Sequence, residues 1–202
     1  GAAGGLNVIL KTLINPGDEV IAFAPYFVEY GSYVRNYDGN LVVISPNTED
    51  FQPNLEKLGE KITPRTKAVI INTPNNPTGV VYSAGTLARM ADILRERQTQ
   101  LGTDIVLIAD EPYRELAYDG VEVPYVTGFY ENTVICYSYS KSLSLPGERI
   151  GYLVIPDALK DSQEVFNAAT IANRVMGAVN APSLMQRVIK RCVDENVNLE
   201  AY

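Results

Sequence analysis

The sequence contains no histidine among its 202 residues. Catalytic triads that use histidine as the base are therefore excluded, and so are metal sites that use it as a ligand. A general base in this chain must be a lysine, aspartate, glutamate, tyrosine or cysteine. This restriction leaves a small set of reactions that the chain could support.

Cysteine is scarce, and long apolar or basic runs are absent. Cys136 and Cys192 lack the spacing of metal ligands, and two thiols in a chain of this size indicate a reducing compartment, so we expect a cytoplasmic protein. No apolar run approaches the length that crosses a membrane, and no signal peptide is visible. The net charge is −7, without a basic run. We therefore expect neither a membrane nor a nucleic acid as a partner.

Six short apolar runs alternate with segments of helical periodicity. The runs predict strands at residues 20–23, 41–44, 67–71, 105–109, 134–136 and 150–155. Among the helices, we expect one from about 26 to 37, one capped by Ser83, and a last pattern that continues to Tyr202. This alternation is typical of βαβ units. We predict an α/β fold over residues 1–202, with three α/β/α layers around a mostly parallel sheet.

Polar clusters follow four of the predicted strands, at residues 25–27, 72–79, 110–113 and 138–141. In parallel sheets, ligands bind beyond the carboxyl ends of the strands. We therefore expect these four clusters to form one site.

The segment from Tyr137 to Arg149 is the most informative of these clusters. Lys141 lies in a serine-rich loop after an apolar run, and a desolvated lysine amine can act as a nucleophile. Hydroxyl groups, a guanidinium and a glycine-rich helix start are suited to binding a phosphate. The residues of these types are Ser138, Ser140 and Arg149, together with the helix start after Gly1. The alternative is a solvated turn with an ordinary surface lysine.

Other clusters offer groups that would bind a ring. Asp110 follows an apolar run, where a charge is costly unless it meets a cation or a donor. Phe27 offers a flat face for stacking, or is a core aromatic, and Tyr113 and Asn76 offer directed hydrogen bonds. An aldehyde for the lysine, a ring nitrogen for the aspartate and a phosphate occur together in pyridoxal 5′-phosphate. This cofactor is our prediction.

Five motifs resemble the large domain of the class I/II (fold-type I) aminotransferases, close to the aspartate aminotransferases. They occur in the family's order over nearly the whole chain. The motifs are Asn15-Pro16-Gly17-Asp18-Glu19-Val20, Pro25-Tyr26-Phe27, Asn75-Asn76-Pro77-Thr78-Gly79, Asp110-Glu111-Pro112-Tyr113, and Ser138-Tyr139-Ser140-Lys141 with Arg149. The resemblance implies an enzyme that transfers an amino group between an amino acid and a 2-oxo acid.

The resemblance also implies residue roles. Lys141 would bind the cofactor covalently and move the substrate's α-proton, and Asp110 would pair with the protonated ring nitrogen. Tyr113 and Asn76 would bind the ring's phenolic oxygen, and Phe27 would stack on the ring. The phosphate would be bound by Ser138, Ser140, Arg149 and the backbone of Ala2 and Ala3, although Ser140 could instead only shape the loop. Pro25 and Pro77 match positions where the family has cis peptide bonds.

Two positions depart from the family. Ala2 and Ala3 can offer only main-chain N–H groups where many relatives have a phosphate-binding side chain, so we expect a weaker contact. Phe27 stands where aspartate-specific enzymes often have tryptophan, which leaves the substrate open.

The resemblance covers only the large domain. An N-terminal segment and a C-terminal small domain, which supplies the arginine for the substrate carboxylate, are expected in a longer parent that forms a homodimer. We therefore expect residues 1–202 to transaminate poorly alone. Two alternatives stay open: another enzyme on this scaffold, such as a C–S β-lyase, and the aminotransferase-like sensor domain of a transcription regulator.

Overall fold

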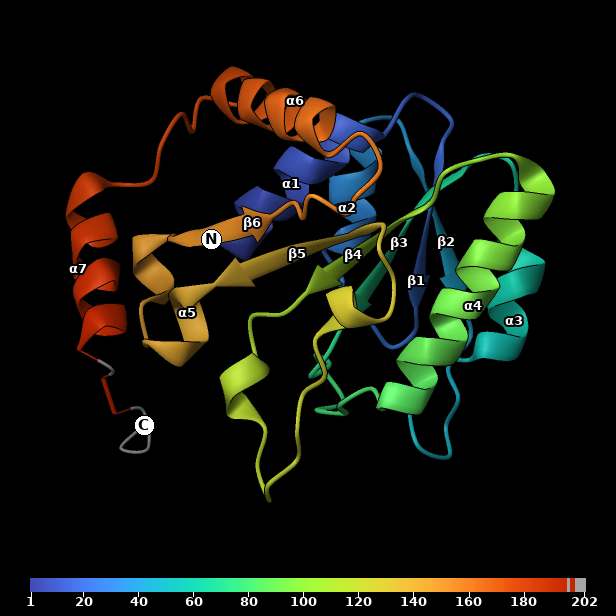
Figure 1. The fold of residues 1–202 in the computed structure, drawn as a ribbon, viewed down its shortest axis with the longest axis horizontal. Coiled ribbons are helices and arrows are strands. Elements are labelled where there is room, and N and C mark those ends of the chain that lie inside the picture. Colours follow the sequence, from blue (N-terminus) through green and yellow to red (C-terminus); the bar gives the residue numbers. More distant parts are fainter. Residues whose placement is uncertain (196, 199–202) are drawn as a thin grey trace.

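The computed structural model describes residues 1–195 and 197–198. Its strands are β1 (Glu19–Phe23), β2 (Asn40–Ile44), β3 (Thr66–Asn72), β4 (Val106–Asp110), β5 (Thr133–Ser138) and β6 (Gly151–Val154). They form one sheet in the order β2-β1-β3-β4-β5-β6 (Figure 1). The first five strands are parallel, and β6 runs antiparallel to β5. The predicted α/β fold with a mostly parallel sheet is confirmed.

Helices cover both faces of this sheet. The α-helices are α1 (Ala2–Leu13), α2 (Tyr30–Arg35), α3 (Leu55–Lys61), α4 (Ala84–Leu101), α5 (Tyr139–Ser142), α6 (Ser162–Val175) and α7 (Ser183–Asp194). Three short 3-10 turns are η1 (Arg114–Leu116), η2 (Val126–Gly128) and η3 (Pro146–Glu148). None of the helices in the described part of the chain is both long and apolar enough to cross a membrane.

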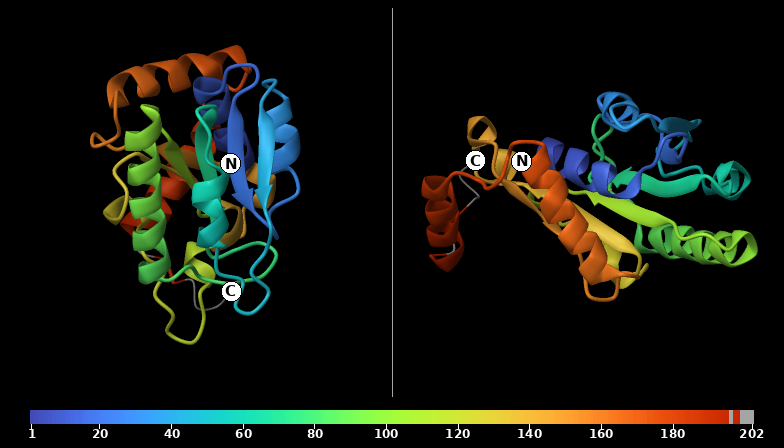
Figure 2. Two further views of the ribbon diagram at one scale, coloured as in Figure 1. Left: turned by 90° about the vertical axis from the view of Figure 1, so that its right-hand side faces the viewer. Right: turned by 90° about the horizontal axis from the view of Figure 1, so that it is seen from above.

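The apolar core has two main parts, one on each face of the sheet. On one face, Leu6, Ile9 and Leu10 of α1 pack with Val34 of α2 against the strands. On the other face, α3 and α4 bury Leu58 and Met90, among others, against the same strands. Figure 2 shows α2 and α4 on opposite sides of the sheet. The strands are buried on both faces, which explains their continuous apolar runs.

Helix boundaries follow from local sequence where capping residues are present. The Ser83 side chain accepts a hydrogen bond from the backbone N–H of Thr86 at 3.0 Å, as the sequence predicted for an N-cap. The same helix ends at Gly102, whose φ of 64° lies in the left-handed region that favours glycine. Asn54 caps α3 in the same way as Ser83 caps α4.

The differences from the sequence-based expectation include the following three segments. Helix α2 is shorter than the predicted helix at 26–37, because residues 24–29 turn over the end of β1 before the helix begins. Strand β5 extends to Ser138, two residues beyond its predicted end. Helix α7 ends at Asp194, and the predicted continuation to Tyr202 extends over residues outside those described.

The prolines expected to be cis, Pro25 and Pro77, are cis, and Pro74 is cis as well.

Helix α7 lies apart from the sheet (Figure 1), and among its described side chains only Ile189 is buried.

Candidate functional site

A cavity of about 260 Å³ lies at the carboxyl ends of β3, β4 and β5, beside the first turn of α1. We call it the strand-end cavity. All ten residues that the sequence singled out line it: Ala2, Ala3, Phe27, Asn76, Asp110, Tyr113, Ser138, Ser140, Lys141 and Arg149. Four residues that the sequence analysis did not select complete the lining: Leu6, Asn72, Pro112 and Pro146. The predicted convergence of the four polar clusters is therefore observed.

Asp110 is the last residue of β4 and is 5% exposed. The hydroxyl of Tyr30 donates a hydrogen bond to its Oδ2 at 2.6 Å. Within the described residues, Asp110 Oδ1 has no hydrogen-bond partner. Burial raises the pKa of Asp110 to about 7, the Tyr30 hydrogen bond lowers it, and the charge of Glu111 raises it. A buried carboxylate with one unpartnered oxygen beside a cavity is suited to receiving a cationic N–H group.

A chain of amide contacts joins β3, β4 and the loop after β3. Asn72 lies beside Asp110 in the strand register, and its side-chain amide donates to the backbone carbonyl of Asp110 at 2.8 Å. The backbone N–H of Asn76 donates to Asn72 Oδ1 at 2.6 Å, and the Asn76 side chain donates to the Tyr113 hydroxyl at 3.1 Å. Asn76 and Tyr113 thus lie close enough to bind one oxygen atom of a ligand together.

Other lining residues of the cavity carry groups that bind anions. The Ser138 Oγ accepts a hydrogen bond from the Ser140 N–H at 3.1 Å and lies 2.7 Å from the Ser140 Oγ. The Arg149 side chain donates to the carbonyl of Pro146 at 2.8 Å, and the Gly1 amino group donates to the Arg149 carbonyl. Helix α1 begins here after Gly1, which has no side chain to cap it. Its first-turn N–H groups and helix dipole therefore favour an anion.

Lys141 and Phe27 also line the cavity. Lys141 belongs to the four-residue helix α5, and its Nζ lies 5.9 Å from the centre of the Tyr113 ring. Phe27 meets the Tyr30 ring edge-on at 5.7 Å and packs against the core under α1 and α2. Phe27 therefore lines the cavity and also contributes to the core. Tyr30 contacts both Phe27 and Asp110, and the only signal for it in the sequence was its place just after the 25–27 cluster.

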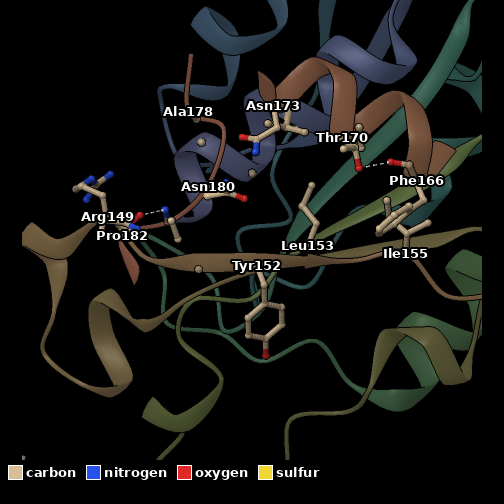
Figure 3. A pocket seen from close by; sticks show the side chains of 17 residues that line it. Arg149, Tyr152, Leu153, Ile155, Phe166, Thr170, Asn173, Ala178, Asn180 and Pro182 are labelled. Carbon is tan, nitrogen blue, oxygen red and sulfur yellow. Dashed lines mark hydrogen bonds between the residues drawn. The ribbon is translucent and has the colours of Figure 1, made fainter. Parts of the chain in front are cut away.

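A second cavity, of about 370 Å³, lies between α1, β6 and α6. We call it the α1–α6 cavity. Its lining is Gly1, Gly4, Gly5, Val8, Arg149, Gly151, Tyr152, Leu153, Ile155, Phe166, Ala169, Thr170, Asn173, Ala178, Asn180, Ala181 and Pro182. Figure 3 shows Leu153 on the cavity side of β6 and the Tyr152 ring on the other side. No group of three or more cysteine or carboxylate side chains that could hold a metal occurs in the described ranges.

Comparison with known proteins gives consistent matches. The family model for aminotransferase class I and II matches residues 1–198. A Thermus aquaticus protein named "Probable aspartate/prephenate aminotransferase" is 37% identical over 173 residues, which cover 84% of this chain and 43% of that protein. An Aquifex aeolicus protein of the same name is 36% identical over 192 residues, which cover 90% and 47%.

Solved structures give the same result. An amino transferase from Eubacterium rectale superposes with a TM-score of 0.93 at 48% identity, covering 95% of this chain and 48% of that one. The Thermus thermophilus aspartate aminotransferase solved with maleate gives a TM-score of 0.75 at 33% identity, covering 86% and 43%. The chain therefore spans about half the length of the proteins that it matches.

Proposed function

This chain belongs to the class I and II aminotransferase family, and we propose that it is the cofactor-binding part of a pyridoxal 5′-phosphate-dependent aminotransferase. The longer parent would transfer an amino group between an amino acid and a 2-oxo acid. One observation carries the proposal: a lysine amine, an aspartate with an unpartnered buried oxygen, and an anion-binding helix start line a single cavity.

The residues fit this cofactor chemically. When bound, pyridoxal phosphate supplies a ring that withdraws electrons from the substrate's α-carbon. The unpartnered Oδ1 of Asp110 would accept the N–H of the ring nitrogen, and this charge pair would hold the carboxylate ionised despite its burial. The Asn76 amide and the Tyr113 hydroxyl, 3.1 Å apart, would donate to the phenolic oxygen.

Three further roles complete the assignment. The Nζ of Lys141 would hold the aldehyde carbon and then move the α-proton of the substrate. Ser138, Ser140 and Arg149, together with the N–H groups of Ala2 and Ala3, would bind the phosphate. Phe27 would cover one face of the ring. Because two alanines occupy the start of α1, the contact there would come from the main chain alone.

We extend the proposal to the whole protein. The parent would act in the cytoplasm as a homodimer, and its substrates would be small molecules, an amino acid and a 2-oxo acid. Exposed apolar side chains on α6 and α7, such as Phe166, Ile171 and Leu184, support a subunit contact. The named relatives and solved structures are aminotransferases, so a C–S β-lyase and a sensor domain of a regulator are not favoured.

A half-reaction assay tests the proposal. The chain is mixed with pyridoxal phosphate and a panel of amino acids, and pyridoxamine phosphate and 2-oxo acid are measured. We expect a visible absorbance band that is lost after borohydride treatment, and slow formation of both products. Pyruvate, ammonia and a thiol from a cysteine conjugate would instead identify a lyase. If the longer parent binds the cofactor tightly but does not react with amino acids, the result would support a sensor domain and contradict the proposed aminotransferase.

A further inference from the structure

The first turn of α1 lies unusually close to β5 and β6. Gly151 pairs with Ser138 across these strands, and a Cβ atom at Gly151 would lie 2.3 Å from the Tyr137 carbonyl oxygen and 3.0 Å from the Gly1 Cα. The buried Cys136 thiol of β5 donates to the carbonyl of Ala2 at 3.2 Å. The start of the helix therefore packs closely on β5 and β6, where Gly151 leaves no space for a side chain.

Two adjacent glycines in α1 face different surroundings. A Cβ atom at Gly5 would lie 2.9 Å from the Cys136 Sγ and 3.2 Å from Leu153 Cδ2, whereas a Cβ atom at Gly4 would have no other heavy atom within 4 Å. Real Cβ atoms are essentially never found as close as 2.9 Å, so a side chain at Gly5 would require a shift. Leu153 borders the α1–α6 cavity and has space to move, but Cys136 is fully buried on β5, between β4 and β6.

A displacement of Gly5 would also displace residues that line the strand-end cavity. The N–H of Gly5 donates to the carbonyl of Gly1 at 3.1 Å, so the first turn moves as one unit with Gly5. Ala2 and Ala3 belong to this turn and line the cavity. Neither has a side chain that could follow a displaced ligand, so the position of the main chain alone sets the geometry of their N–H groups.

We propose that Gly5 is a positioning residue for the first turn of α1. The absence of a side chain at Gly5 lets this turn pack closely on Cys136, and that packing holds the start of α1 at the height where the Ala2 and Ala3 N–H groups meet the phosphate of the cofactor. This inference rests on the proposed function. It predicts that the phosphate contact, and not the covalent contact through Lys141, depends on the absence of a side chain at position 5.

The test compares Gly5→Ala with Gly4→Ala, its matched control. Both substitutions exchange the same residue types within one helix, so both change helix propensity alike. The dissociation constants of pyridoxal phosphate and of pyridoxal, which lacks the phosphate, are measured by absorbance, and that of inorganic phosphate by its competition with pyridoxal phosphate. For Gly5→Ala we expect pyridoxal phosphate and inorganic phosphate to bind about tenfold more weakly, the cost of one hydrogen bond to a charged group. Pyridoxal binding should be unchanged, and Gly4→Ala should match the original chain for all three ligands.

The double variant Gly5→Ala/Cys136→Ala removes the sulfur that the new methyl group would meet. We expect it to recover most of the phosphate affinity, and this comparison remains informative if Gly5→Ala alone folds poorly. Equal phosphate affinity in Gly5→Ala and Gly4→Ala would overturn the inference, and so would a double variant no better than Gly5→Ala. A parallel loss of pyridoxal binding would indicate general unfolding and also contradict it. If the unmodified chain binds pyridoxal no more weakly than pyridoxal phosphate, the proposed function itself fails.

Discussion

The strand-end cavity and the α1–α6 cavity differ in chemistry more than in size. The α1–α6 cavity is the larger, about 370 Å³ against about 260 Å³, and its lining is mostly glycine, alanine and aliphatic side chains. The strand-end cavity is lined by an amine, a carboxylate, a phenol and a guanidinium. Arg149 and the start of α1 border both. Convergent polar groups, and not volume, therefore identify the site.

The difference follows from where each cavity lies in the fold. The strand-end cavity collects side chains from the ends of three parallel strands and the loops that follow them, which approach one another in any fold of this type. The α1–α6 cavity lies between two helices and an edge strand, and most of the residues that line it are small or apolar. The following substitutions test whether the two cavities are functionally separate.

Lys141→Ala should produce the largest effect. Removing the amine removes both the covalent link to the cofactor and the group that moves the α-proton. We expect the half-reaction rate to fall by more than about a thousandfold and the absorbance band to disappear. Retention of the band would mean that another lysine holds the cofactor. A far-ultraviolet spectrum like that of the original chain verifies the fold.

Asp110→Asn should have the next largest effect. The amide cannot form a charge pair with the ring nitrogen, so we expect pyridoxal phosphate to bind about a hundredfold more weakly. In the cofactor-free chain, the same substitution should raise stability at high pH, because it removes a buried carboxylate that would ionise there. Since the carboxyl has a pKa of about 7 when folded and about 3.9 when unfolded, the folded state binds more protons between these values, and stability falls as pH rises through this window.

The measurement is the free energy of unfolding, in urea from pH 4 to pH 8, of the original chain and of the Asp110→Asn variant, both without cofactor. Glu111, whose pKa burial also raises, is common to both forms, so its contribution largely cancels in the difference. The shift of about three pKa units in Asp110 corresponds to about 4 kcal/mol between the two ends of the range. Parallel pH curves for the two forms would show that Asp110 is not perturbed.

Tyr30→Phe should have a moderate effect. The ring and its contact with Phe27 remain, but Asp110 loses its hydrogen-bond donor at 2.6 Å. We expect the pKa of Asp110 to rise further and cofactor affinity to fall about tenfold. Tyr130→Phe is the matched control, because its buried hydroxyl donates to the Ile105 carbonyl at 2.8 Å, in the core on the other face of the sheet.

Both variants should lose about 1–3 kcal/mol of stability, and only Tyr30→Phe should weaken the cofactor. The same affinity loss in the two would show that general stability, and not the Asp110 contact, sets binding.

The sequence was sufficient to predict ten of the residues that line the strand-end cavity. Asp110 and Ser138 are strand-end residues, and parallel topology brings such residues together whatever the detailed packing. The sequence did not reveal the partner of Asp110, since Tyr30 reaches it only because residues 24–29 turn over the end of β1. Asn72 was likewise unselected, because its contact with Asp110 depends on the register of β3 and β4.

The close contact beneath α1 could not be predicted for a related reason. In the sequence, Gly5 is one of several glycines at a helix start. Its lack of space for a side chain is evident only in the structure, where α1 lies against Cys136 and Leu153. Contacts between segments more than a hundred residues apart depend on tertiary packing, which local patterns do not encode.

Phe166→Ala should have the smallest effect. It changes the α1–α6 cavity and tests whether cofactor binding in the strand-end cavity depends on it. Phe166 lines the α1–α6 cavity from α6 and is 56% exposed, so its removal exposes little new core and should change stability by less than about 0.5 kcal/mol. Cofactor affinity, measured by absorbance titration, should stay within about twofold. A loss of tenfold or more would mean that α6 acts on the strand-end cavity through α1, which it contacts along the small face of Val8, Ala169 and Ala172. The two cavities would then be one coupled unit, and the start of α1, which borders both, would be the element that joins them.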